Sequence, residues 1–102
     1  MVAIMTKDAK KSLAKIYKTY QERRSHGMDK LNSKYFDPSD DQETLELAES
    51  VREDIPELKK IGFVKAYITG QFELQDQAIV YMENVKAETI KEWLSFGSNL
   101  IP

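Results

Sequence analysis

The chain has 102 residues, which fits one domain, and its formal net charge is −2. It contains no cysteine, which excludes a disulfide framework, a thiolate metal site and cysteine catalysis. The first residues lack the pattern of a secretory signal, and no stretch approaches the roughly 20 apolar residues of a membrane span. We therefore expect one cytoplasmic domain over residues 1–102, with residues 1–5 flexible and 97–102 forming a tail.

Charge is distributed unevenly along the chain. Residues 1–36 carry nine basic and three acidic residues, a net +6, whereas residues 37–57 carry one arginine and nine acidic residues, a net −8. The simplest interpretation is two solvated helix faces at opposite ends of one domain. The alternative is that the acidic run forms a surface for a basic partner, because complementary fields guide encounter. The candidate residues of this acidic surface are Asp40, Asp41, Glu43, Glu46, Glu49 and Glu53.

The N-terminal third shows helical periodicity. Thr6 is a capping residue, apolar residues then recur at three- and four-residue spacing, and Gly27 can supply a left-handed stop, which predicts a helix over about 7–25. Asp29 can cap a second, short helix that continues through Phe36. These two helices carry most of the basic residues.

A third helix is predicted at about 40–52, after a second group of capping residues. Ser39 is the expected cap, and the acidic residues that follow suit the first turn of a helix. The apolar face of this helix consists of Thr44, Leu47, Ala48 and Val51.

The region that follows contains both a helix signal and a proline. Asp54 and Glu57 have capping-box spacing, and Pro56 would fall in the first turn of a two-turn helix that ends at Gly62. A single helix over 39–61, bent at Pro56, is equally compatible with the pattern. We leave these two alternatives open.

A β-hairpin is predicted next. Residues 63–68 are rich in β-formers, Thr69-Gly70 has the composition of a two-residue turn, and residues 71–74 return. Val64, Ala66 and Ile68 share the apolar face of the first strand. A helix to Asn84, with Ile79 and Met82 turned inward, and a last helix over about 87–96, which Gly97 ends, complete the prediction. The expected fold class is therefore mainly α with one small β-hairpin (α+β).

The order of these elements resembles that of winged-helix proteins of the MarR and PadR kind. The segment LKKIGFV at 58–64 is similar to the stretch that leads into the wing, and LQDQAI at 74–79 to the stretch that enters the next helix, with Gln75 in place of the usual threonine. The stretches 20–28 and 78–84 are similar to small, uncharacterised winged-helix proteins of Gram-positive bacteria and their phages. The resemblance implies a winged helix-turn-helix-like domain with a C-terminal helix.

Members of that wider class often bind DNA, so the resemblance implies a DNA-reading helix before Gly62 and a wing at 63–74. The candidate DNA contacts are Arg52, Lys59, Lys60, Lys65, Lys30 and Lys34. The acidic run opposes this function, because nonspecific DNA affinity comes from neutralising phosphates. The wing tip, Thr69-Gly70, also carries no basic residue.

The sequence offers little for catalysis. His26 is the only histidine and falls at a predicted helix end, the glycines are isolated, and residues 37–41 lack the glycine of a calcium loop. We therefore expect a non-enzymatic domain without a cofactor or metal, and no small-molecule ligand is evident.

A protein-interaction or regulatory module is the function that we favour, with a DNA-binding transcriptional regulator as the alternative. Members of the wider class often dimerise through terminal helices, and the last helix carries a broad apolar arc. The candidate dimer residues are Ile90, Trp93 and Leu94. Internal packing of the same three residues is the simpler interpretation.

Overall fold

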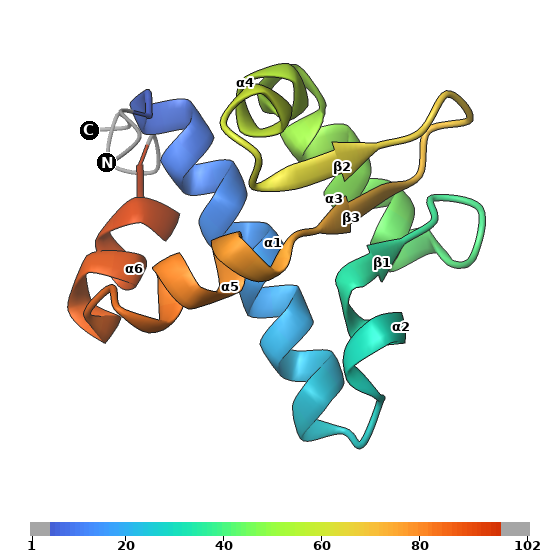
Figure 1. Cartoon of the computed structure of the whole chain (residues 1–102), viewed down its shortest axis with the longest axis horizontal. Coiled ribbons are helices and arrows are strands. Elements are labelled where there is room, and N and C mark those ends of the chain that lie inside the picture. Colours follow the sequence, from blue (N-terminus) through green and yellow to red (C-terminus); the bar gives the residue numbers. More distant parts are fainter. Residues whose placement is uncertain (1–4, 97–102) are drawn as a thin grey trace.

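In a computed structural model of the chain, which describes residues 5–96, helices pack against a small antiparallel sheet and leave its outer face open (Figure 1). The elements are α1 (Lys7–Ser25), α2 (Lys30–Lys34), β1 (Tyr35–Phe36), α3 (Gln42–Val51), the 3₁₀ turn η1 (Arg52–Asp54), α4 (Ile55–Lys60), β2 (Val64–Ala66), β3 (Phe72–Leu74), α5 (Asp76–Glu83) and α6 (Ala87–Leu94). The expected tail at 97–102 and most of the expected flexible start lie outside the described residues. Met5, however, is only 5% exposed and belongs to the core, contrary to that expectation.

Helix α1 is the central element of the molecule. Its predicted bounds are confirmed, and the Thr6 side chain accepts a hydrogen bond from the backbone N–H of Ala9 at 3.2 Å. Helices α2 to α6 all contact it (Figure 1). Its buried positions lie on more than one side, because it is packed from several directions: Ala9, Ser12, Leu13, Ala14, Ile16, Tyr17 and Tyr20.

The second predicted helix is too long. It ends at Lys34, and Tyr35 and Phe36 instead form β1, which pairs with β3 in an antiparallel register that places Phe36 opposite Phe72. The rings of Phe36 and Phe72 stack at 5.0 Å, and this long-range pairing overrides the local helical pattern. Leu31, predicted on an apolar face, is 66% exposed.

The predicted hairpin is confirmed, but its turn differs. The backbone N–H of Tyr67 donates to Gln71 O at 2.9 Å, and Gly70 donates to Tyr67 O at 3.1 Å, so the loop has three residues, 68–70. Gly70 takes the left-handed position (φ +97°) that such loops require. Ile68, expected on the buried face of the strand, lies at the tip and is fully exposed. The sheet order is β1-β3-β2.

The region 39–62 is two helices joined by a 3₁₀ turn, which decides between the two alternatives. Helix α3 is capped by Asp41, not Ser39: the Asp41 carboxylate accepts a hydrogen bond from the Thr44 N–H at 2.7 Å. Turn η1 then leads into α4, which has Pro56 in its first turn, as predicted.

The predicted capping box at the start of α4 is wrong. Asp54 makes no side-chain cap, and its carboxylate accepts a hydrogen bond from the Ser12 hydroxyl at 2.5 Å. The Glu57 carboxylate accepts from the Thr6 N–H at 2.8 Å and from its hydroxyl at 2.9 Å. The two carboxylates therefore link η1 and α4 to α1, because their hydrogen-bond donors are Ser12 on α1 and its cap residue Thr6.

The C-terminal pair, α5 and α6, packs against α1 and completes the core. Ile79 and Met82 point inward, as predicted. Helix α6 ends at Leu94, two residues earlier than predicted, and the predicted stop at Gly97 lies outside the described residues. Within residues 5–96, no helix has the length and apolar character needed to cross a membrane.

Candidate functional site

The main candidate site is an acidic face on α3 and η1, made of Glu43, Glu46, Glu49 and Glu53. All four side chains are exposed, while Thr44 and Val51 on the other side of the helix are buried. At 3.6 residues per turn, the three glutamates of α3 fall within an arc of about 120°, and Glu53 follows them on the 3₁₀ turn. The role of these exposed carboxylates as a partner surface stays a prediction.

The two aspartates predicted to belong to the same surface differ from each other. Asp40 is exposed beside the start of α3. Asp41 is the α3 cap, and the hydrogen bond from the Thr44 backbone lowers the pKa of its carboxyl. Asp41 therefore caps the helix and is exposed as well, so the exposed acidic surface consists of the acidic face, Asp40 and Asp41.

Three of the predicted DNA contacts lie on the turn and helix that follow the acidic face. Arg52 on η1 and both Lys59 and Lys60 in the last turn of α4 are exposed. Because Glu57 is directed toward Thr6, the lysines are the only exposed charged residues of α4. The basic residues Lys59 and Lys60 at the end of α4 thus follow the acidic face closely along the chain.

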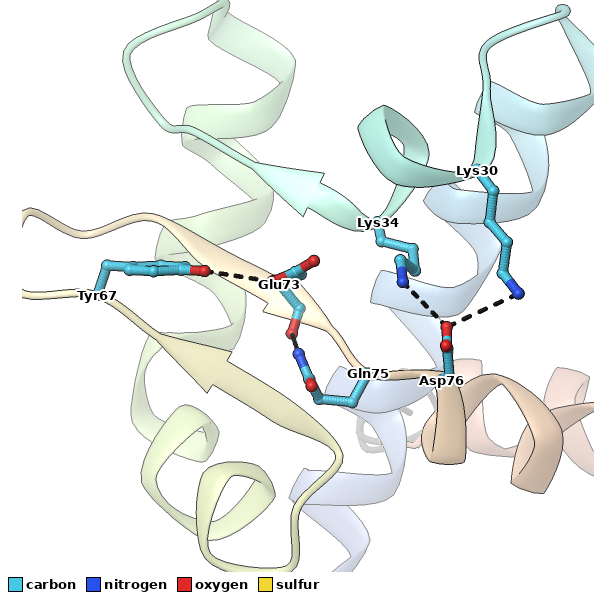
Figure 2. A network of polar contacts seen from close by, with 6 residues as sticks. All are labelled: Lys30, Lys34, Tyr67, Glu73, Gln75 and Asp76. Atoms are coloured by element: carbon cyan, nitrogen blue, oxygen red, sulfur yellow. Dashed lines mark hydrogen bonds and ion pairs between the residues drawn. The ribbon is translucent and has the colours of Figure 1, made fainter.

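Two further predicted DNA contacts, Lys30 and Lys34, lie beside the carboxylate of Asp76 (Figure 2). The Asp76 carboxylate, at the start of α5, is 2.9 Å from Lys34 Nζ and 3.8 Å from Lys30 Nζ. The hydrogen bond from Lys34 lowers the pKa of Asp76. Since the Lys34 side chain is only 13% exposed, this pair joins α2 to α5 rather than offering a free cation to DNA.

The outer face of the sheet carries polar and aromatic side chains. Glu73 on β3 stands between Tyr35 on β1 and Lys65 on β2, and it accepts a hydrogen bond from the Tyr67 hydroxyl at 3.2 Å (Figure 2). The Lys65 ammonium lies 5.3 Å from the Tyr67 ring centre. Lys65, the sixth predicted DNA contact, is therefore exposed beside a carboxylate, which weakens it as a phosphate ligand. The Gln75 amide donates to the Glu73 carbonyl oxygen.

The predicted dimer helix, α6, turns its aromatic residue inward. Trp93 is 6% exposed, and the Lys10 ammonium lies 5.7 Å from its ring. Ile90 and Leu94 are half-buried against the same core. A dimer seam on α6 would therefore lack the tryptophan as an anchor.

Three hollows adjoin α3. The largest, about 670 Å³, lies between the end of α1 and the start of α3 and is lined by side chains of mixed character, including Arg23, His26 and Glu43. Another, about 350 Å³, is polar and lies between the first half of α1 and the junction of α3 with η1. The third, about 320 Å³, is an apolar groove between α3 and the hairpin. The apolar residues that line this groove include Leu45, Ala48, Ile55, Ala66, Tyr67 and Phe72.

Arg23 has a role that the sequence did not reveal. Its guanidinium donates to Tyr35 O at 2.7 Å and to the Thr44 hydroxyl at 3.1 Å, and it lies 4.4 Å from the Phe36 ring centre. It thereby joins α1 to β1 and to the acidic helix α3. Sequence reasoning counted it only as a helix-terminal cation, since its partners are distant in the chain.

The described part of the chain holds no cluster of side chains suited to a metal ion. His26 is exposed at the C-terminal cap of α1. Across residues 5–96, no three His, Asp or Glu side chains are placed to share a metal ion.

Comparison of the chain with protein-family models, with curated proteins and with solved structures found no significant match.

Proposed function

We propose that the protein is a non-enzymatic, winged-helix-like interaction module that presents the acidic face to a basic surface of a partner protein. The element order supports the winged-helix part of this proposal. Leading helices, a helix that ends at Gly62 and a hairpin that runs into the next helix are the order that the resemblance implies, and the chain has this order. Function does not follow from this arrangement alone and depends on the surface.

The observation that carries the proposal is the outward direction of all four glutamates on α3 and η1. In a winged-helix arrangement these elements directly precede the DNA-reading helix, so their carboxylates would repel phosphates. The same carboxylates attract a basic protein surface and orient its approach. A stripe of carboxylates on a helix also resembles a row of phosphates, so the DNA-binding surface of another protein is a suitable partner.

Affinity capture with charge-neutralised variants tests this proposal. The triple variant E43Q/E46Q/E53Q removes three charges and leaves Glu49, which also lines the groove, unchanged. The matched control E83Q/E88Q/E92Q removes three exposed charges from α5 and α6. We expect a lysate of the source organism to yield a protein that wild type and control retain and the α3–η1 variant loses.

Salt provides the second readout of the same capture. Because the attraction is between exposed charges, raising the salt concentration to about 0.5 M should release the partner. Capture of the same proteins by all three immobilised forms, or of none by the wild type, would contradict the proposed function.

DNA binding is the second candidate, and one observation favours it. The side of α4 that faces solvent carries Lys59 and Lys60 without an acidic neighbour on that helix, because Glu57 contacts Thr6. Helix α4 has only six residues, and the wing tip at 68–70 carries no cation. If the protein binds DNA, the wild type should shift a random duplex in a gel mobility assay at low salt, and K59E/K60E should abolish that shift.

A further inference from the structure

The tip of the β-hairpin and the groove beside it form a knob and a hole on one surface. Ile68 is fully exposed at the tip, which projects beyond the helices (Figure 1). Its neighbours Tyr67 and Gly70 line the apolar groove of about 320 Å³ between the hairpin and α3. A fully exposed apolar side chain therefore lies next to an open apolar groove.

The rim of this groove carries one charge of each sign. Glu49 on α3 and Arg52 on η1 both line the groove and are both exposed. Among the described residues, neither of them forms an ion pair within the chain. The edge of the groove thus presents one carboxylate and one guanidinium, each available for an ion pair with another molecule.

We propose that this surface binds a second copy of the same chain about a two-fold axis. In such an interface each residue pair occurs twice, so a surface must be complementary to itself. Ile68 of one copy enters the groove of the other copy, while Glu49 of each copy faces Arg52 of the other. The contact uses the wing and the adjoining edge of α3, not α6. It shares Glu49 with the acidic face but does not use Glu43, Glu46 or Glu53.

The area of the proposed dimer interface determines the affinity that we expect for the dimer. One inserted isoleucine and one ion pair on each side make a small interface, below the standard size of about 1,600 Å². We therefore expect a weak, reversible dimer, with a dissociation constant of roughly 10–100 μM.

Sedimentation equilibrium of the full chain tests the contact at the tip. The wild type should approach twice its monomer mass as its concentration rises, and I68D should raise the dissociation constant at least about tenfold. The matched control V80D places the same charge on another exposed apolar residue, on α5, and should behave as wild type. A wild type that remains monomeric up to about 1 mM, or equal weakening by V80D and I68D, would overturn the proposal.

A charge-reversal cycle tests the rim independently of the tip. E49R and R52E should each weaken the dimer about tenfold, because each places like charges opposite one another twice. The double variant E49R/R52E restores opposite charges across the axis and should recover wild-type affinity within about threefold. A double variant as weak as either single variant would show that these side chains do not face each other.

Discussion

Replacing Arg23 with alanine should lower the free energy of unfolding by about 2–3 kcal/mol, the largest effect that we expect from a partly exposed residue. The guanidinium donates to Tyr35 O, Asn32 O and the Thr44 hydroxyl, and it covers the Phe36 ring. Alanine removes every one of these contacts. Chemical denaturation followed by circular dichroism measures the loss, which corresponds to a fall in Tm of roughly 10–20 °C.

The next residue in the chain provides the control for this variant. Arg24 is exposed, and its guanidinium donates one hydrogen bond, to Met28 O at 3.1 Å. R24A removes the same charge from the same helix turn and should cost about 0.5 kcal/mol. Equal losses in R23A and R24A would show that Arg23 acts through the charge of α1 alone and does not join three elements.

Replacing Gly62 with alanine should destabilise the fold by about 2 kcal/mol. Gly62 has φ +84° at the end of α4, where Phe63 N–H donates to Leu58 O and Gly62 N–H donates to Lys59 O, the two bonds of a Schellman motif. A methyl group there would also displace the Gln77 side chain, which donates to the Gly62 carbonyl. Thermal unfolding followed by circular dichroism measures the sum of these two effects.

Gly27 separates the backbone effect from the contact with Gln77. It ends α1 with the same pair of hydrogen bonds and φ +91°, but an added methyl group meets nothing within 4 Å. G27A should therefore cost about 1 kcal/mol, the strain of the left-handed backbone alone. If G27A destabilises the protein as much as G62A does, the contact of Gln77 with Gly62 contributes nothing to the free energy of unfolding.

Local signals predicted the helices and the hairpin of this chain well. Thr6 and Gly27 lie at the two ends of α1, and each acts on residues within four positions of itself. Strand β1 was missed because Tyr35 and Phe36 pair with residues 72–73, whose position the local pattern does not encode. The same reason explains the wrong capping box, since the carboxylate of Asp54 finds its donor on α1.

The candidate site was partly predictable for a related reason. Helical spacing alone places the three glutamates of α3 on one side of that helix. The engagement of Lys30 and Lys34 by Asp76 could not be predicted, because it depends on how α2 meets α5. The exposed Ile68 had a signal in the sequence, an apolar residue beside a predicted turn, which we assigned to the buried face of the strand.

Direct binding of duplex DNA tests the central claim, that the acidic face makes this fold a protein-binding module and not a DNA reader. Fluorescence anisotropy of a labelled random duplex, at low salt, should show no binding by the wild type up to about 100 μM, a concentration at which nonspecific DNA binders are commonly saturated. The variant E43Q/E46Q/E53Q should bind no less than the wild type, and measurably more if the repulsion alone prevents contact. Saturable binding by the wild type that K59E/K60E abolishes would contradict the claim and assign α4 to DNA.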